Sequence, residues 1–121
     1  MDRKTMVYWI ATGLFCAIFL FGGVNHILRT QMIAEGVASL GYPAYLMTIL
    51  GVAKLLGVAA LLVPGRPLLK EWAYAGFTFD LLGASASHAF SGDSVAEMAI
   101  PLVLLVVGVV SYRLRPPAKQ L

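Results

Sequence analysis

Four long apolar stretches, separated by short polar segments, make up most of this chain. A helix needs roughly 20 mostly apolar residues to cross a hydrocarbon layer about 30 Å thick, and inside lipid only helices or closed barrels pair all their backbone polar groups. The stretches are long enough for helices and lack the strict alternation of barrel strands. The pattern therefore predicts an all-α fold, an integral membrane four-helix bundle with spans at residues 6–28, 44–63, 69–89 and 95–112.

The segment between the first two spans has a different pattern, with apolar and polar residues on opposite sides of a helical repeat. The apolar positions are Ile33, Val37 and Leu40, and the polar positions are Gln31, Glu35 and Ser39. Gly41 and Pro43 then provide a stop. We expect a short interfacial helix on the membrane surface, which either caps the bundle or forms a lid over a ligand entrance.

Composition supports a membrane protein. Of the 121 residues, 60% are hydrophobic and 12% are charged, and the mean hydropathy is +0.83. A soluble domain of this size keeps too much surface in water to hide so many apolar side chains. No small-x-small cleavage site follows the first stretch, so we interpret it as a retained helix of a single domain, residues 1–121. The single cysteine, Cys16, excludes an internal disulfide or a dithiol shuttle within the chain.

The positive charges predict the orientation. Arg29 flanks one side of the spans, and seven basic residues flank the other: Arg3, Lys4, Arg66, Lys70, Arg113, Arg115 and Lys119. The positive-inside rule then places both termini in the cytoplasm, in a multi-pass protein of the cell inner membrane. All Trp and Tyr residues, including Tyr8 and Tyr74, fall near span ends, as expected of rings in the headgroup layer. No basic helix or aromatic platform indicates nucleic acid.

Two charged residues lie deep within the spans. Lys54 is about ten residues from the outer start of the second span and Asp80 about nine from the outer end of the third, so at about 1.5 Å per residue both lie near mid-membrane. A lone charge there costs roughly 2.5 to 3.5 kcal/mol, and pairing lowers the cost. We expect Lys54 and Asp80 to be partners, either in a buried salt bridge or in a proton-responsive, substrate-orienting site.

Small residues surround both charges. On the third span they recur at spacings of three, four and seven, at Ala73, Gly76, Gly83, Ala84 and Ser87. On the second span Gly51 and Gly57 bracket Lys54. Small residues let helices pack closely. The alternative is a narrow cavity, left by the missing side chains, that holds a hydrophobic ligand.

A second polar group gathers at the outer end of the predicted bundle, at Asn25, His26, Ser87, His88, Asp93 and Glu97. A metal or haem site would use the two histidines, but no close-spaced ligand motif supports it, so we expect no metal and disfavour haem. A proton relay and ordinary hydrogen-bonded side chains are the alternatives. Pro101 removes a backbone donor from the last span, and we expect a kink that opens space beside Glu97.

The chain resembles DoxX-like small membrane proteins from the first span through Glu97. The resemblance rests on the order and spacing of residues 22–26 (GGVNH), 40–43 (LGYP), 51–57 (GVAKLLG), 70–76 (KEWAYAG) and Ser87-His88. Many DoxX-like relatives carry Glu at the position of Lys54. The family's name comes from a subunit of thiosulfate:quinone oxidoreductase, so the resemblance implies a four-helix fold and a link to quinone or thiol redox chemistry.

The leading hypothesis is a redox-associated membrane subunit that holds a lipophilic small molecule between its helices, with quinone as the candidate cofactor. Lys54 would polarise a ligand oxygen, Asp80 would orient the lysine, and His88 completes the candidate catalytic set. The candidate ligand-binding residues are His26, Asn25, Ser87 and Glu97.

Three other functions stay open. A small membrane enzyme, an isomerase or hydrolase, would use Asp80 and a histidine as acid and base. A transporter of the small drug-exporter kind is disfavoured because the first span lacks an acid. A scaffold without a ligand would use its small-residue faces to contact a redox enzyme subunit or a second copy in a homodimer. The sequence does not decide whether the chain is an enzyme.

Overall fold

The computed structural model describes all 121 residues, and its regular structure is entirely helical. The elements are α1 (Arg3–Leu28), α2 (Gln31–Ser39), α3 (Tyr45–Leu62), α4 (Pro67–Phe90), α5 (Val95–Arg113) and a short 3-10 helix, η1 (Pro117–Lys119). The prediction of an all-α fold is confirmed, as is the short helix between the first two long ones.

Local sequence explains where the helices begin. Helix α1 starts before the predicted residue 6 because the Asp2 carboxylate accepts a hydrogen bond from the Thr5 N–H at 2.7 Å and caps the helix. Helix α4 starts at Pro67, before the predicted residue 69, since proline is tolerated in the first helical turn. Gly65 precedes it with a φ of 69°, in the left-handed region that favours glycine. This turn folds α4 back against α3.

Three helices, α1, α3 and α5, are long and apolar enough to cross a membrane. Helix α4, with 24 residues, is long enough but is not one of the three. Its sequence includes Lys70, Glu71 and Asp80, which lower its hydropathy. Three of the four long helices are therefore apolar enough to cross a membrane by composition alone, and α4 combines apolar residues with these charged ones.

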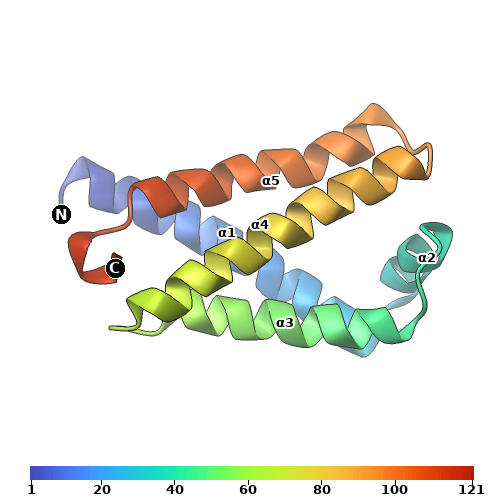
Figure 1. Ribbon diagram of the computed structural model, residues 1–121, viewed down its shortest axis with the longest axis horizontal. Coiled ribbons are helices and arrows are strands. Elements are labelled where there is room, and N and C mark those ends of the chain that lie inside the picture. The colour runs from blue at the N-terminus through green and yellow to red at the C-terminus, as the bar shows by residue number, and fades with distance from the viewer.

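The four long helices form a ring of neighbours, in which α1 and α4 each contact α3 and α5 (Figure 1). Helices α3 and α5 run in the same direction, and α4 runs in the opposite one. Both termini and the α3–α4 turn lie at one end, and α2 lies at the other. We call the first end the closed half (residues 3–19, 57–79 and 104–121) and the second the open half (residues 20–56 and 80–103).

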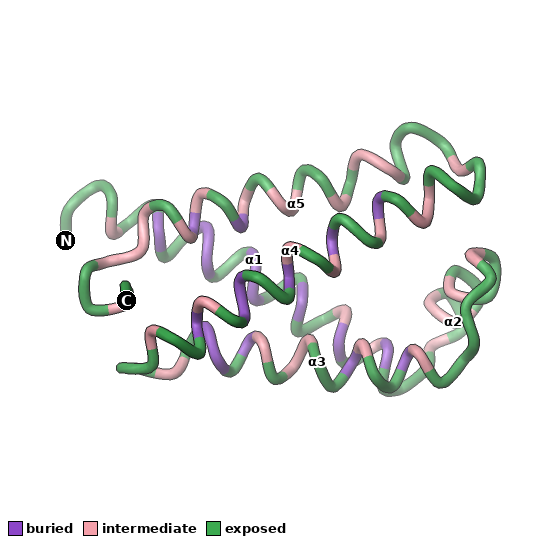
Figure 2. Tube along the Cα trace, viewed as in Figure 1, coloured by how far each residue is buried: buried purple, intermediate pink, exposed green.

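Aromatic side chains fill the closed half. Phe15, Phe19 and Phe77 are buried, with ring centroids 4.1 to 5.3 Å apart. Glycines make room for the rings: a Cβ on Gly57 would collide with Phe77, and one on Gly108 would lie 2.7 Å from Phe15 Cε1. Gly57 was expected to let helices pack closely, and its contact with Phe77 is of this kind. Figure 2 shows the buried positions on the inward faces of the long helices and none on α2.

Polar side chains link three helices in the same half. Ser111 Oγ of α5 lies 2.5 Å from Thr12 Oγ1 of α1 and 2.7 Å from the Tyr74 hydroxyl of α4, and all three residues are buried. Tyr8 is buried as well, with 1% of its surface exposed. Tyr8 and Tyr74 therefore face the interior of the bundle and not its outer surface. Tyr74 lies inside because its hydroxyl finds a hydrogen-bond partner there.

Lys70 is also buried, with 1% of its surface exposed. Its ammonium donates hydrogen bonds to the carbonyls of Ala60 and Leu61, at 3.0 and 3.2 Å, and to that of Val63. Carbonyls in the last turn of a helix have no helical partner, and a cation suits the negative end of the helix dipole. Lys70 of α4 thus caps α3, beyond the flanking role inferred from its charge.

Candidate functional site

The open half contains a cavity of about 470 Å³ between α1, α3 and α4. Its size falls within the range of ligand pockets, about 300 to 1,000 Å³. The polar side chains that line it are His26, Tyr42, Lys54, Asp80, Ser87 and His88. The remaining lining residues are apolar or small, so the cavity combines an apolar wall with a few polar groups.

Helix α2 and the loop after it cover the cavity. Val37 and Leu40 line it from this side, but no residue of α2 is buried. The Tyr42 hydroxyl lies 2.5 Å from Ser87 Oγ and so connects the loop to the end of α4. The sequence had assigned Tyr42 only to the membrane interface, although it stands within the LGYP segment. The cover is held to the rest of the protein by few buried contacts.

Lys54 and Asp80 both line the cavity but do not form the expected ion pair. No nitrogen–oxygen contact within 4.0 Å joins them. Lys54 Nζ turns toward α1 instead, 5.7 Å from the centroid of the Phe19 ring. Helices α3 and α4 diverge from their connecting turn toward the open half (Figure 1), so residues at equal depth face a common space without touching. The prediction of a direct salt bridge is wrong.

His26 enters the cavity from α1. It is 9% exposed, and its Nδ1 lies 2.7 Å from the Gly22 carbonyl. Because a carbonyl only accepts hydrogen bonds, Nδ1 carries the proton and Nε2 is left for another partner. The backbone of α1 therefore fixes both the orientation and the tautomer of this imidazole.

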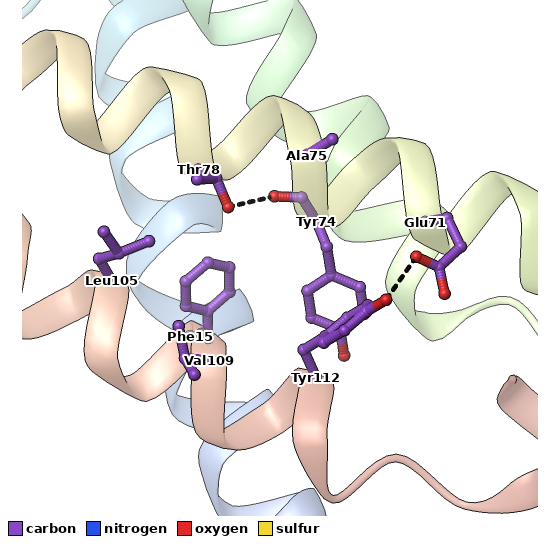
Figure 3. A pocket seen from close by; sticks show the side chains of 9 residues that line it. Phe15, Glu71, Tyr74, Ala75, Thr78, Leu105, Val109 and Tyr112 are labelled. Atoms are coloured by element: carbon purple, nitrogen blue, oxygen red, sulfur yellow. Dashed lines mark hydrogen bonds between the residues drawn. The ribbon is translucent and has the colours of Figure 1, made fainter.

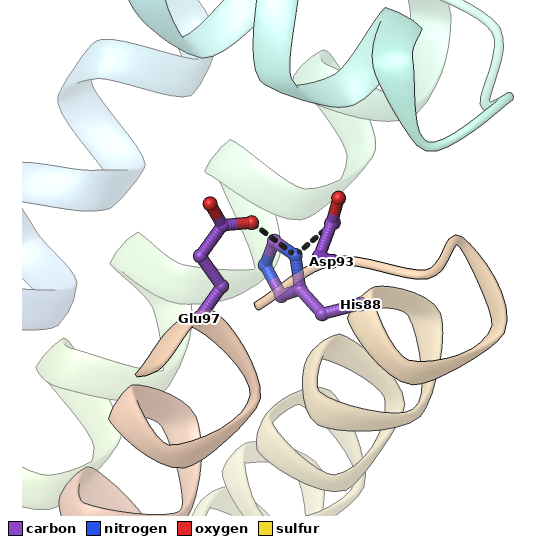
Figure 4. Close-up of side chains that lie close together, drawn as sticks. All are labelled: His88, Asp93 and Glu97. Atoms are coloured by element: carbon purple, nitrogen blue, oxygen red, sulfur yellow. Dashed lines mark hydrogen bonds and ion pairs between the residues drawn. The ribbon is translucent and has the colours of Figure 1, made fainter. Parts of the chain in front are cut away.

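His88 lies at the cavity's edge and contacts two acids (Figure 4). Its Nδ1 is 2.7 Å from Asp93 Oδ2 and 3.6 Å from Glu97 Oε2. The ligand atoms of the three residues lie within 4.8 Å of one another, so this is the set that could share a metal ion. From the sequence, the two histidines were the candidate ligands of a metal, and none was expected because no close-spaced ligand motif supports it. The His88–Asp93 hydrogen bond accounts for the approach of these side chains without one.

Two of the predicted ligand-binding residues do not line the cavity. Asn25 Nδ2 donates to the Phe21 carbonyl at 2.8 Å, one turn earlier on α1. Glu97 is exposed in the first turn of α5, which continues through Pro101 as one helix. The cavity therefore brings together five of the seven predicted site residues: His26, Lys54, Asp80, Ser87 and His88.

A second hollow, which we call the lateral groove, lies between α3 and α4 and measures about 310 Å³. It shares Leu50, Lys54 and Asp80 with the cavity. From there it extends past Gly76 to Trp72, whose side chain is exposed. The two hollows thus meet at the two charged residues.

A third hollow, of about 260 Å³, lies between α4 and α5 in the closed half (Figure 3). The Tyr112 hydroxyl donates to Glu71 Oε2 at 2.9 Å, and Arg115 pairs with Glu71 Oε1 at 3.0 Å. Thr78 Oγ1 donates to the Tyr74 carbonyl at 2.8 Å. These polar groups already have partners, so this hollow offers a ligand little more than an apolar wall.

Glycines differ in what surrounds them in these hollows. Gly51 packs against α1, where a Cβ would lie 2.6 Å from Ile27 Cγ1. Gly76 and Gly83, expected to form part of a packing stripe, have nothing within 4 Å of the point that a Cβ would occupy, and they line the lateral groove and the cavity. On α4 the small residues therefore leave space, whereas on α3 they bring helices together.

Comparison with known proteins gives one family. No curated protein and no solved structure matches the chain. The model of the DoxX-like family matches residues 10–111, which include every residue that lines the cavity. Since this match covers most of the 121 residues, the chain belongs to the DoxX-like family.

Proposed function

We propose that this DoxX-like protein is a four-helix membrane bundle that binds a lipophilic small molecule in the cavity of its open half. The ligand has an oxygen-bearing head, and quinone is the first candidate. In this proposal the protein serves as a redox-associated subunit of the cell inner membrane. With Cys16 as its only cysteine, it relies on a partner for dithiol chemistry.

The directions of the helices support α4 as a fourth membrane span. Helices α3 and α5 are apolar enough to cross the membrane and run in the same direction (Figure 1). Helix α4 connects them through short turns, so it must cross back if both of its neighbours cross. The charges Lys70 and Glu71 then lie near one end of the span, and Asp80 lies within it. With the positive-inside rule, both termini face the cytoplasm.

One observation carries the proposal: Lys54 faces the cavity without a hydrogen-bond or ion-pair partner in the protein. A cation in a low-dielectric site is costly unless a polar group faces it. A carbonyl or phenolate oxygen of a ligand supplies that group. Asp80, across the shared space, balances the charge of the lysine. His26 contributes its free Nε2, and Ser87 and His88 stand at the mouth.

Binding of a short-chain quinone to the purified protein in nanodiscs tests this function. Lys54→Met should lower the affinity about tenfold or more, because it removes a charge-assisted hydrogen bond. Lys4→Met, which removes an exposed lysine outside the cavity, is the matched control and should bind like the parent. Equal affinity in the parent and Lys54→Met, or no binding by either, would contradict the proposal.

The His88–Asp93 hydrogen bond favours a second candidate, an acid–base enzyme acting on a membrane-soluble substrate. A carboxylate that holds the Nδ1 proton of a histidine leaves Nε2 positioned as a base toward the cavity. Asp80 would be the complementary acid. Lipid extracts incubated with the protein should then show a species that His88→Gln and Asp80→Asn do not produce. Identical extracts from parent and variants would exclude this candidate.

A further inference from the structure

We propose that the lateral groove between α3 and α4 binds a hydrocarbon tail carried by the molecule whose head occupies the cavity. This inference rests on the proposed function and adds the ligand's class: an amphiphile with one oxygen-bearing head and one long, unbranched or isoprenoid tail. The head lies among Lys54, Asp80 and His26, and the tail leaves it toward Trp72.

The continuity of the two hollows is the first argument. Leu50, Lys54 and Asp80 line both the cavity and the lateral groove. A head that contacts Lys54 from the cavity therefore stands at the inner end of the groove. Its tail can follow the groove along α3 and α4 toward their connecting turn, where Leu69 and Trp72 line the far end.

The shape and chemistry of the groove are the second argument. Between Asp80 and Trp72 it follows eight residues of α4, or about 12 Å of helix. Beyond the two charged residues its wall is apolar or small, with Gly57, Ala73 and Gly76 among the lining residues. Beyond Lys54 and Asp80, the one polar side-chain group of the wall is the indole N–H of Trp72, at the exposed far end. A tail gains dispersion contacts along such a wall, whereas a second polar head would lose its hydration.

The third argument concerns competition with ordinary lipid. An apolar groove open to the bilayer gives no preference for one hydrocarbon over another, since lipid tails are as apolar as the wall. A tail tethered to a bound head is different, because the tether raises its effective concentration at the groove. The charged residues at the inner end thus select the head, and the tether selects the tail.

Three glycines provide a matched test, because a Cβ meets nothing within 4 Å at Gly76, Gly83 or Gly13. Leucine at position 76 fills the lateral groove, and leucine at position 83 fills the cavity. Leucine at position 13 lies on an exposed face of α1 and lines neither hollow. All three variants exchange glycine for the same residue within a helix, so their effects on helix propensity are similar.

The experiment measures binding of two probes in nanodiscs of one lipid composition: a benzoquinone with one prenyl unit and the same ring with a ten-carbon tail. Comparing variants within one lipid composition cancels the greater partitioning of the longer probe. We expect Gly76→Leu to weaken the long-tail probe about tenfold, by analogy with changes of one group in an apolar pocket, and to leave the short probe unchanged. Gly83→Leu should weaken both probes, and Gly13→Leu neither.

The outcomes separate this inference from the function on which it rests. If the parent binds the short probe and Gly76→Leu binds both probes like the parent, the groove holds no tail, although the cavity assignment stands. If Gly76→Leu weakens both probes equally, the groove residue acts on the head and the inference is overturned. If the parent binds neither probe, the proposed function fails and the groove loses its ligand.

Discussion

The two halves of this molecule use similar residues for different ends. In the closed half, phenylalanine rings fill the space beside Gly57 and Gly108, and the buried hydroxyls of Thr12 and Ser111 are hydrogen-bonded to each other. In the open half, Gly83 borders empty space, and Lys54 has no hydrogen-bond or ion-pair partner. The difference shows that small and polar residues mark packing where their partners are supplied by the chain, and a ligand site where they are not.

Removing a ring from the closed half should have the largest effect. Phe77→Ala takes away a buried ring that contacts Phe15 and Phe19, and it should lower the free energy of unfolding by about 3 kcal/mol or more. Phe21→Ala, at an exposed position of α1, is the control and should change it little. Denaturant titration in micelles measures both. Equal losses would mean that the closed half does not hold the molecule together.

The loss of the lysine that caps α3 should come next. Lys70→Met keeps the length of the side chain but leaves the Ala60 and Leu61 carbonyls without their donor, at a cost of about 2 kcal/mol. Hydrogen exchange of the α3 C-terminal amides should quicken with it. Lys4→Met should leave both quantities near those of the parent. A variant as stable as the parent would refute the capping role.

A pair of glycine variants compares the halves directly. Gly57→Ala pushes a methyl group into the Phe77 ring, and overpacking of this kind costs about 1 to 3 kcal/mol. Gly83→Ala meets nothing, so the higher helix propensity of alanine should make it neutral or stabilising by up to about 1 kcal/mol. Thermal unfolding of the two variants gives the order. The reverse order would remove the distinction between filled and open positions.

The smallest expected effect is a pH dependence at the start of α1. Hydrogen bonds from the Thr5 side chain and backbone hold the pKa of Asp2 below its ordinary value of 3.8. The cap therefore stabilises the first turn above pH 3.8 and is lost as the pH falls through the lowered pKa. Amide exchange at Thr5, corrected for intrinsic rates, should rise over that range. Asp2→Asn, which keeps a capping oxygen, should remove the pH dependence.

The sequence predicted the elements well because hydropathy, caps and turn residues are local. Depth along a helix is local too, since the rise per residue is fixed, and Lys54 and Asp80 do line the same space. The direction of each side chain depends on how α3 and α4 diverge, which no short segment encodes. For that reason the predicted salt bridge failed.

Other features of the site and the core could be recognised only from the three-dimensional structure. Lys70 resembled any basic residue beside a span, and only the path of the α3–α4 turn turns it into a cap. His88, Asp93 and Glu97 are brought together by the α4–α5 turn. The sequence did contain a signal for the Thr12–Ser111 hydrogen bond of the closed half. Both residues carry hydroxyls within apolar spans, where an unpaired hydroxyl is costly.

The central claim is that a lipophilic ligand binds with its head at Lys54 in the open half, and not in the hollow between α4 and α5. Photolabelling with a quinone that carries a reactive group on its ring, followed by peptide mass spectrometry, tests it most directly. The account predicts labels on α3 and α4 around Lys54 and Asp80, suppressed by excess unlabelled quinone and reduced in Lys54→Met. Labels confined to the hollow around Phe15 and Tyr112, or labels that excess quinone does not suppress, would contradict it.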